Sequence, residues 1–73
     1  MTIAGRWIND TESEAVCHLL ERPVGIGGLT AAEMNAMAAL TRKGLAEFRG
    51  GAYRPTLLLM TAMRDAYRCL EVA

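Results

Sequence analysis

The sequence has few of the residues from which enzyme active sites and metal centres are built. Its 73 residues include two cysteines and one histidine. Two cysteines cannot form a disulfide-rich scaffold, and one histidine cannot complete an ordinary zinc site. His18 and Cys17 are neighbours, but adjacent side chains on a helix point about 100° apart and do not face each other. We therefore predict no catalytic residue, no cofactor and no metal.

The chain also lacks a net charge and a long apolar run. Eight basic side chains balance eight acidic ones, so no global field draws the chain to nucleic acid or to a membrane. The longest uninterrupted apolar run, Leu57–Met60, is far too short to span a bilayer. The N-terminus has no basic head followed by an apolar stretch, as a signal peptide would. We expect a cytoplasmic protein in which Cys17 and Cys69 are free thiols.

What the chain does have is a high apolar content for its size. Hydrophobic residues make up 52% of the sequence, yet a single core of this size seldom contributes more than about 3–5 kcal/mol of stability. Such small domains usually depend on disulfides, a metal or a second copy of themselves. Because the sequence supplies neither of the first two, the composition predicts a homodimer.

A capping box predicts the start of the first helix. Thr11 is the expected N-cap, and Glu14 lies three residues later, where its side chain can accept a hydrogen bond from the Thr11 backbone N–H. The apolar period then runs over residues 12–21 and stops before Arg22-Pro23. We expect a short N-terminal helix, followed by a flexible glycine-rich connector that lacks the preceding strand of a phosphate-binding loop.

The second helix has the strongest local signal in the sequence. Thr30 and Glu33 form another capping box. The helix is expected over residues 31–49, where Gly50-Gly51 supplies a C-terminal stop. Gly44 then falls inside the helix, where glycine costs about 1 kcal/mol relative to alanine, so we expect it to permit close approach of a neighbouring backbone.

The third helix is expected over residues 55–72, with Pro55 in its first turn. Together the three elements predict an all-α fold with one domain over residues 1–73. In this compact three-helix unit, the short N-terminal helix accompanies an antiparallel hairpin of the two longer helices.

Four methionines recur as two pairs, Met34/Met37 and Met60/Met63. Methionine fills irregular gaps in cores and is also over-used at adaptable binding surfaces. The pairs predict packing between the second and third helices, part of it between molecules. Copper binding through the thioethers is disfavoured, because soft-metal sites recruit additional Cys or His at defined spacing.

The third helix has an apolar arc that is too wide for one neighbour. The arc covers roughly 200°, compared with the ~100° stripe of an ordinary surface helix. We expect the second helix to cover one side, and the first helix, a second copy or a foreign partner to cover the other. The side chains expected at this partner or dimer interface are Leu59, Met60, Met63, Tyr67 and Leu70, rimmed by Arg64 and Arg68.

The segment FRGGAYR is the best surface candidate outside the helices. Arg49, Tyr53 and Arg54 surround two glycines in the expected turn between the long helices. Arg and Tyr dominate binding hot spots, and both residue types also hold phosphates. The alternative is a capped turn with solvated arginines and a Tyr53 that packs on the third helix.

From these features we expect a non-enzymatic regulatory protein that docks on a larger protein through its apolar helix face. It would act by occlusion, as an inhibitor, anti-activator or adaptor of the kind that phages and mobile elements encode. One alternative is a nucleic-acid-binding transcriptional regulator that uses the basic later helices, and another is a structural homodimer or assembly subunit. Salt separates the first two, because nucleic-acid binding weakens steeply between about 50 and 200 mM salt and apolar docking does not.

Overall fold

The computed structural model describes the backbone of residues 1–72 and the side chains of residues 1–65. Over this range the chain forms three helices and five strands. In chain order they are β1 (Thr2–Ile3), β2 (Arg6–Trp7), α1 (Asp10–Glu21), β3 (Val24–Gly25), α2 (Ala31–Arg42), β4 (Ala46–Arg49), β5 (Ala52–Pro55) and α3 (Leu57–Val72). The predicted all-α helical bundle is therefore wrong, because strands form both before α1 and on either side of α2.

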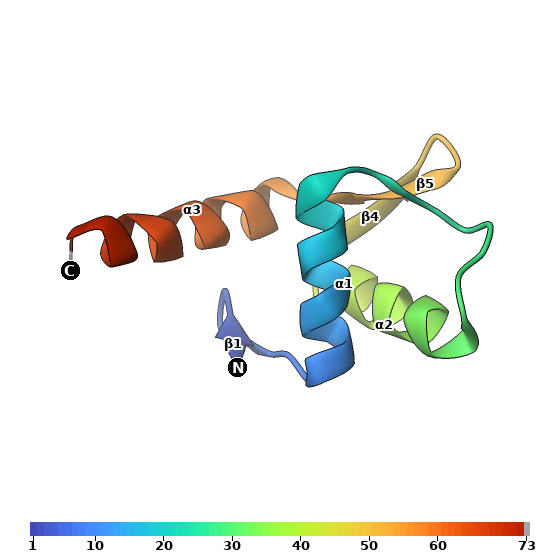
Figure 1. Ribbon diagram of the computed structural model, residues 1–73, viewed down its shortest axis with the longest axis horizontal. Coiled ribbons are helices and arrows are strands. Elements are labelled where there is room, and N and C mark those ends of the chain that lie inside the picture. The colour runs from blue at the N-terminus through green and yellow to red at the C-terminus, as the bar shows by residue number, and fades with distance from the viewer. Residues whose placement is uncertain (73) are drawn as a thin grey trace.

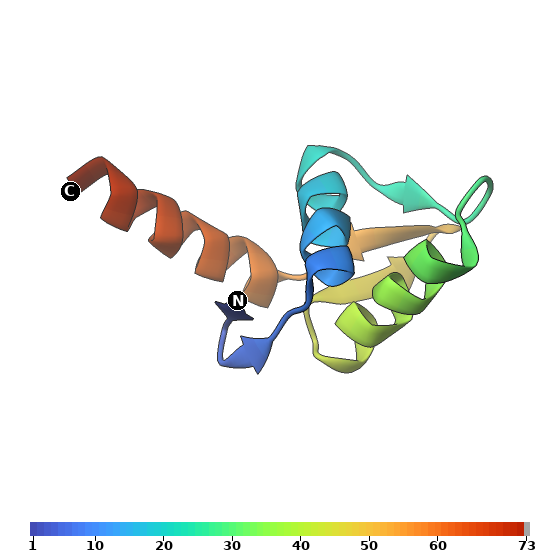
Figure 2. The ribbon, with the colours of Figure 1, turned by 60° about the horizontal axis from the view of Figure 1, so that its bottom comes forward.

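The strands belong to two antiparallel sheets. β1 and β2 pair as a hairpin, and the second sheet has the strand order β3-β5-β4. α1 and α2 pack against each other, α1 also contacts β5, and α2 contacts β4. α3 contacts β1 near its start and then extends away from this body, as both views show (Figures 1 and 2).

The hydrophobic core lies between the two packed helices, the three-stranded sheet and the start of α3. Each of these elements contributes apolar side chains with almost no solvent exposure. The largest fully buried side chains are Ile8, Val16, Leu19, Met37, Leu40, Leu45 and Leu59.

Gly44 ends α2 instead of lying inside it. Its φ is +77°, in the left-handed region that glycine tolerates best. The Leu45 N–H donates to the Leu40 carbonyl at 2.9 Å, and the Gly44 N–H donates to the Thr41 carbonyl at 3.1 Å. These two bonds form a Schellman motif, and buried Leu40 and Leu45 supply its apolar ends. The prediction of a helix over residues 31–49 is therefore wrong in its C-terminal part. The apolar periodicity of the sequence continues past Gly44, but the helix does not.

Gly50 and Gly51 turn a β-hairpin and do not terminate a helix. Their φ angles are +63° and +79°, and a two-residue type I′ turn requires positive φ at both positions. β4 and β5 consequently pair along their full lengths. On one face of the hairpin the rings of Phe48 and Tyr53 meet edge to face, with centroids 5.0 Å apart, an arrangement that stabilises cross-strand pairs.

α1 begins two residues earlier than expected. Asn9 is its N-cap and Glu12 is the reciprocal residue. The Glu12 N–H donates to Asn9 Oδ1 at 2.8 Å, and the Asn9 N–H donates to Glu12 Oε1 at 3.0 Å. The predicted box of Thr11 and Glu14 is wrong, because Asn9 offers the same capping chemistry earlier in the chain.

α3, in contrast, begins later than predicted, at Leu57, because Pro55 belongs to β5. Thr56 holds the start of the helix in place. Its hydroxyl accepts a hydrogen bond from the Leu59 N–H at 3.3 Å and donates one to the Gly44 carbonyl at 2.7 Å. Since Gly44 follows α2, this hydroxyl joins the end of one helix to the start of the next.

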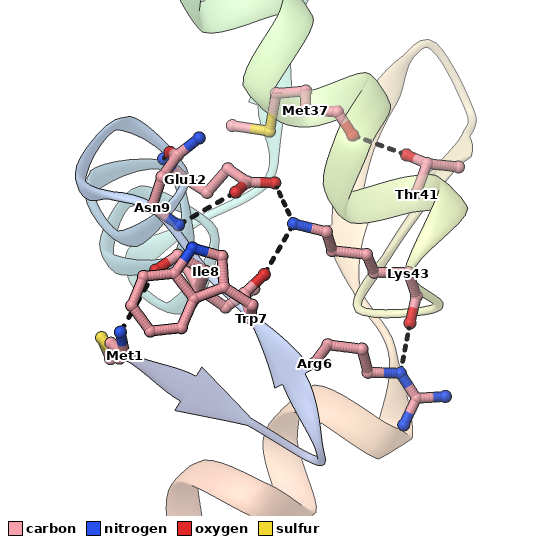
Figure 3. A network of polar contacts seen from close by, with 9 residues as sticks. All are labelled: Met1, Arg6, Trp7, Ile8, Asn9, Glu12, Met37, Thr41 and Lys43. Atoms are coloured by element: carbon pink, nitrogen blue, oxygen red, sulfur yellow. Dashed lines mark hydrogen bonds and ion pairs between the residues drawn. The ribbon is translucent and has the colours of Figure 1, made fainter.

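Lys43 ties the end of α2 to α1 and to the N-terminal hairpin (Figure 3). Its Nζ donates to the Trp7 carbonyl at 2.7 Å and to Glu12 Oε2 at 2.6 Å. Its own carbonyl accepts a hydrogen bond from Arg6 Nε at 2.8 Å. Glu12 is only 3% exposed, so this is an ion pair with a buried carboxylate, whose charge needs such partners.

Acid is expected to weaken the fold through Glu12. Burial raises the pKa of this carboxyl, but hydrogen bonds from the Asn9 N–H and from Lys43, together with the Lys43 charge, bring the pKa below its usual 4.5. A carboxyl whose pKa is lowered in the folded state contributes stability above the unfolded-state pKa, and that stability is lost as the pH falls through the folded-state pKa. The urea midpoint, measured by circular dichroism, should therefore fall below pH 4.5.

The Glu12→Gln variant is the control for this prediction. The variant lacks the titrating carboxyl group. As the pH is lowered from 7 to values below 4.5, its urea midpoint should therefore fall less than that of the wild type. An identical pH dependence in the two proteins would show that Glu12 does not contribute.

Candidate functional site

The described part of α3 carries apolar side chains on both its inner and its outer side. Leu59 is fully buried, and Ala62 and Met63 pack against the core. On the outside, Leu58 is 39% exposed and Met60 is 45% exposed. The first turns of α3 therefore anchor the helix to the body and leave apolar surface uncovered beside the anchor.

The residues predicted at a partner or dimer interface do not share one environment. Leu59 is part of the core of its own chain. Met63 is half-buried, whereas Met60 and Arg64 are exposed. The helical backbone includes Tyr67, Arg68 and Leu70, but their side chains lie outside the described residues.

Each methionine pair places one thioether inward and one outward. Met37 is 2% exposed and belongs to the core, whereas Met34 is 47% exposed. Met63 packs against the core, whereas Met60 is largely exposed. Residues three apart on a helix are separated by about 60° around its axis, so one methionine of a pair can contact the core while the other is exposed.

The structure brings Arg49, Tyr53 and Arg54 together on the β4–β5 hairpin and not in a turn between helices. Tyr53 is half-buried and packs against the core, so it stabilises the hairpin. Arg54 points to the other face of its strand, and its Nε donates to the Arg49 carbonyl at 3.2 Å. The Arg49 side chain is 75% exposed and lies 3.7 Å from a carboxylate oxygen of Glu47. Arg49 is therefore exposed, whereas Arg54 is half-buried.

A groove of about 320 Å³ lies between α1, the loop after β3 and the start of α2. Exposed His18 and Glu14 line one side of it, and Glu33 and Met37 line the other. The Thr30 backbone N–H, which donates to Glu33 Oε1 at 3.1 Å, lowers the pKa of this carboxyl, and the Thr30 hydroxyl lowers it further. The predicted capping box of Thr30 and Glu33 is thereby confirmed, and its carboxylate is engaged in holding the helix end.

The described polar side chains do not have the arrangement of a metal site. Among the residues that the structure describes, no three His, Cys, Asp or Glu side chains gather around a position for one metal ion. No helix in the described part of the chain is both long and apolar enough to cross a membrane. The polar network that the sequence did not reveal, around Lys43 and Glu12, links elements of the fold (Figure 3).

Comparison with known proteins places the chain in no family. No protein-family model, no curated protein and no solved structure matches it. The function proposed below is therefore supported by the geometry and chemistry of the chain itself.

Proposed function

We propose that this chain is a small non-enzymatic regulatory protein that binds another protein through the apolar face of α3. The described part of this apolar face consists of Met60 and Met63, and the spacing of Tyr67 and Leu70 in the sequence continues the same pattern further along the helix. The observation that supports the proposal is that α3 leaves the body of the molecule with apolar side chains exposed beside its anchor. Monomeric proteins seldom leave contiguous apolar surface uncovered unless it is an interaction site.

The energetics of the helix favour a partner. α3 has 16 residues, which corresponds to a length of about 24 Å. Isolated helices shorter than about 12–15 residues are marginal in water, and most helices in proteins are stabilised by packing on one side. Among the described side chains of α3, those of Leu59, Ala62 and Met63 pack on the body, and the ribbon then extends away from it (Figures 1 and 2). Covering the extended part of the helix would stabilise both the helix and the complex.

The spacing of the apolar positions suits insertion of the helix into a groove. Positions 60, 63, 67 and 70 repeat at intervals of three and four residues, as do the anchors of helices that bind in apolar grooves. Methionine adapts its shape to such a groove. Bound in this way, the helix would block the groove of a larger protein against other ligands. We place this action in the cytoplasm, because Cys17 is an exposed free thiol and thiols persist in reducing compartments.

The Met60→Asp substitution is expected to weaken partner binding strongly without unfolding the chain. Met60 is 45% exposed, so a charge there is tolerated in the free protein but would be buried in the complex. Losing the burial of one such side chain weakens binding by about 1.5–3 kcal/mol, or roughly tenfold to a hundredfold. The measurement is affinity capture from cell extract with quantitative mass spectrometry, together with the binding of a dye that fluoresces on apolar surface.

Leu57→Asp is the matched control. Leu57 is 74% exposed and begins the same helix, outside the apolar face, and a carboxylate in the first turn interacts favourably with the helix dipole. Captured proteins and dye fluorescence should decrease with Met60→Asp and persist with Leu57→Asp. If the two variants retain the same proteins as the wild type, the apolar face of α3 is not the docking surface.

A second candidate function is nucleic-acid binding through the β4–β5 hairpin. Arg49 and Arg54 lie on either side of a two-glycine turn with no side chain to keep a phosphate backbone away, and a two-stranded ribbon fits the major groove. Fluorescence anisotropy with labelled duplex DNA should then show binding that weakens steeply between about 50 and 200 mM salt. Replacing both arginines with alanine should reduce this salt dependence. Absence of binding at the lower salt concentration would eliminate this candidate.

A further inference from the structure

We infer that β4 pairs with β4 of a second copy of the chain, so that the two three-stranded sheets join into one continuous antiparallel sheet. The pairing is symmetric about Phe48, and Glu47 of each copy lies opposite Arg49 of the other. This contact goes beyond the proposed function because it uses another surface. The β4–β5 hairpin and the C-terminal half of α3 extend in opposite directions (Figures 1 and 2), so the paired chain keeps α3 free for a target.

β4 is an edge strand whose outer backbone groups are directed away from the sheet. The strand order is β3-β5-β4, so among the described strands β4 has a neighbour on one side. The Thr56 N–H donates to the Leu45 carbonyl at 3.2 Å, and opposite residues along an antiparallel pair alternate between bonded and non-bonded positions. Leu45 and every second residue after it therefore face β5, whereas Ala46 and Phe48 direct their N–H and C=O groups to the free edge. Such groups are a template for another strand.

The charges of β4 select one register for a second copy. Glu47 and Arg49 lie on the same face of the strand with their charged groups 3.7 Å apart. In antiparallel pairing symmetric about Phe48, each carboxylate lies directly opposite an arginine of the other copy, and opposite charges stabilise such pairs. Symmetry about Glu47 would place two carboxylates opposite each other, and a parallel in-register pair would align like charges. Of these three arrangements, only the one centred at Phe48 brings opposite charges together.

The same register provides partners for the outward backbone groups. Opposite residues at a bonded position exchange two hydrogen bonds, so the Phe48 N–H of each copy would donate to the Phe48 carbonyl of the other. Two residues before Phe48, buried Ala46 would lie opposite Gly50 of the other copy. Because Gly50 has no side chain, the tip of the second hairpin can approach this part of the edge.

Exposed apolar side chains lie at the centre of the pairing. Phe48 is on the same face of β4 as Ala46, and Ala46 belongs to the core that α2 helps to form. β4 runs back alongside α2 (Figure 2). The roughly 10 Å of strand from Leu45 to Phe48 corresponds to about seven residues counted back from the end of α2, which places Met34 near the level of Phe48. Met34 is 47% exposed and Phe48 is 50% exposed, and a second copy would bury both.

Met34 also projects from the side of α2 that would face the second copy. α1 contacts β5 and α2 contacts β4, so α2 is the helix nearer to the free edge. Ala32, Ala36 and Ala39 line a depression between α2 and α1. At 100° per residue, Met34 lies on roughly the opposite side of the helix. In a symmetric pair of sheets both α2 helices cover the same face, so the two Met34 side chains approach each other above the paired strands.

Sedimentation equilibrium of the full chain tests this register by charge reversal. Glu47→Arg and Arg49→Glu each place like charges opposite one another at two symmetric positions, and each should weaken the dimer about tenfold or more. An equimolar mixture of the two variants restores opposite charges at both positions, so a mixed dimer should form. Circular dichroism checks that each variant keeps its secondary structure.

Glu21→Arg and Arg22→Glu are the matched controls. They produce the same changes in net charge at exposed positions outside the sheet. Each control variant should dimerise like the wild type, and their mixture should show no preference for mixed dimers. A preference equal to that of the β4 variants would mean that net charge, and not the strand register, brings the copies together.

Hydrogen exchange of single amides tests the backbone pairing in the wild type. The Phe48 N–H would be bonded only in the dimer, so it should exchange more slowly when the protein concentration is raised about a hundredfold. The Glu47 amide faces β5 in both forms and should change much less.

Three results would overturn the inference. A wild type that remains monomeric, or a Phe48 amide that exchanges equally at both concentrations, would exclude the pairing of β4. A dimer that both charge reversals leave intact would exclude this register. None of these results affects the proposed docking face of α3, which the comparison of Met60→Asp with Leu57→Asp tests separately.

Discussion

Lys43→Met is expected to leave most of the protein unfolded. The substitution keeps a similar side-chain length but removes the ammonium group that donates to Glu12 and to the Trp7 carbonyl. The Glu12 carboxylate, 3% exposed, would remain buried without its counter-charge. Breaking a buried pair in this way costs about 3–5 kcal/mol, which equals the whole stability that a domain of this size usually has. Urea titration followed by circular dichroism measures the loss.

Two further variants separate the ion pair from general effects on α2. Arg42→Met changes the preceding, exposed residue and should alter the free energy of unfolding by no more than about 0.5 kcal/mol. Glu12→Gln combined with Lys43→Met should cost less than the sum of the two single changes, because the double variant leaves neither charge of the pair without its partner. A Lys43→Met protein as stable as the wild type would mean that the pair does not hold the fold together.

Leu59→Ala should have the second large effect, since this side chain attaches α3 to the body. Leu59 has no measurable exposure and packs in the core with the helices and the sheet. Truncation of a buried leucine costs about 2–5 kcal/mol. We expect a lower urea midpoint and faster proteolytic cleavage within α3, because the helix loses its anchor before the rest of the core does.

Leu58→Ala provides the comparison for Leu59→Ala. The two residues are adjacent in the same helical turn, but Leu58 is 39% exposed, so its truncation removes much less buried area and leaves no internal cavity. Equal losses of stability for the two variants would show that α3 is not attached through the side of the helix that carries Leu59.

Local chemistry made some elements predictable from the sequence. The capping box of Thr30 and Glu33 involves residues three apart, so its outcome depends little on the rest of the fold. The existence of the first and third helices followed from apolar periodicity in the same way. Their starts were wrong by two residues each, because Asn9 and Thr56 offered caps that competed with the expected ones.

The strands were unpredictable for a different physical reason. The residues of β4 and β5 include alanine, glutamate and arginine, which favour helices in isolation. They become strands because Gly44 stops α2 and the two glycines at 50 and 51 turn the chain back on itself. β5 is also paired with β3, a contact between distant segments that no local pattern reports.

In the candidate site, too, groups of residues close in sequence were predictable and contacts between distant residues were not. Arg49, Tyr53 and Arg54 were recognised as a group because they are close in sequence, although the hairpin that carries them was not foreseen. The network of Lys43 with Glu12 joins residues 31 positions apart, and no local pattern in the sequence indicated that Lys43 contacts a buried carboxylate. The exposed and buried halves of the methionine pairs likewise depend on where α2 and α3 meet the core.

Hydrogen exchange of the α3 backbone amides is the most direct test of the docking face. The amides of α3 should be compared with those of α2 in the free chain, because local opening is more frequent where a helix makes few buried apolar contacts. We predict that amides in the C-terminal half of α3 exchange faster than the amides of α2. Protection of the C-terminal half of α3 equal to that of α2 would contradict the proposal that this helix is uncovered in the free chain and binds a partner.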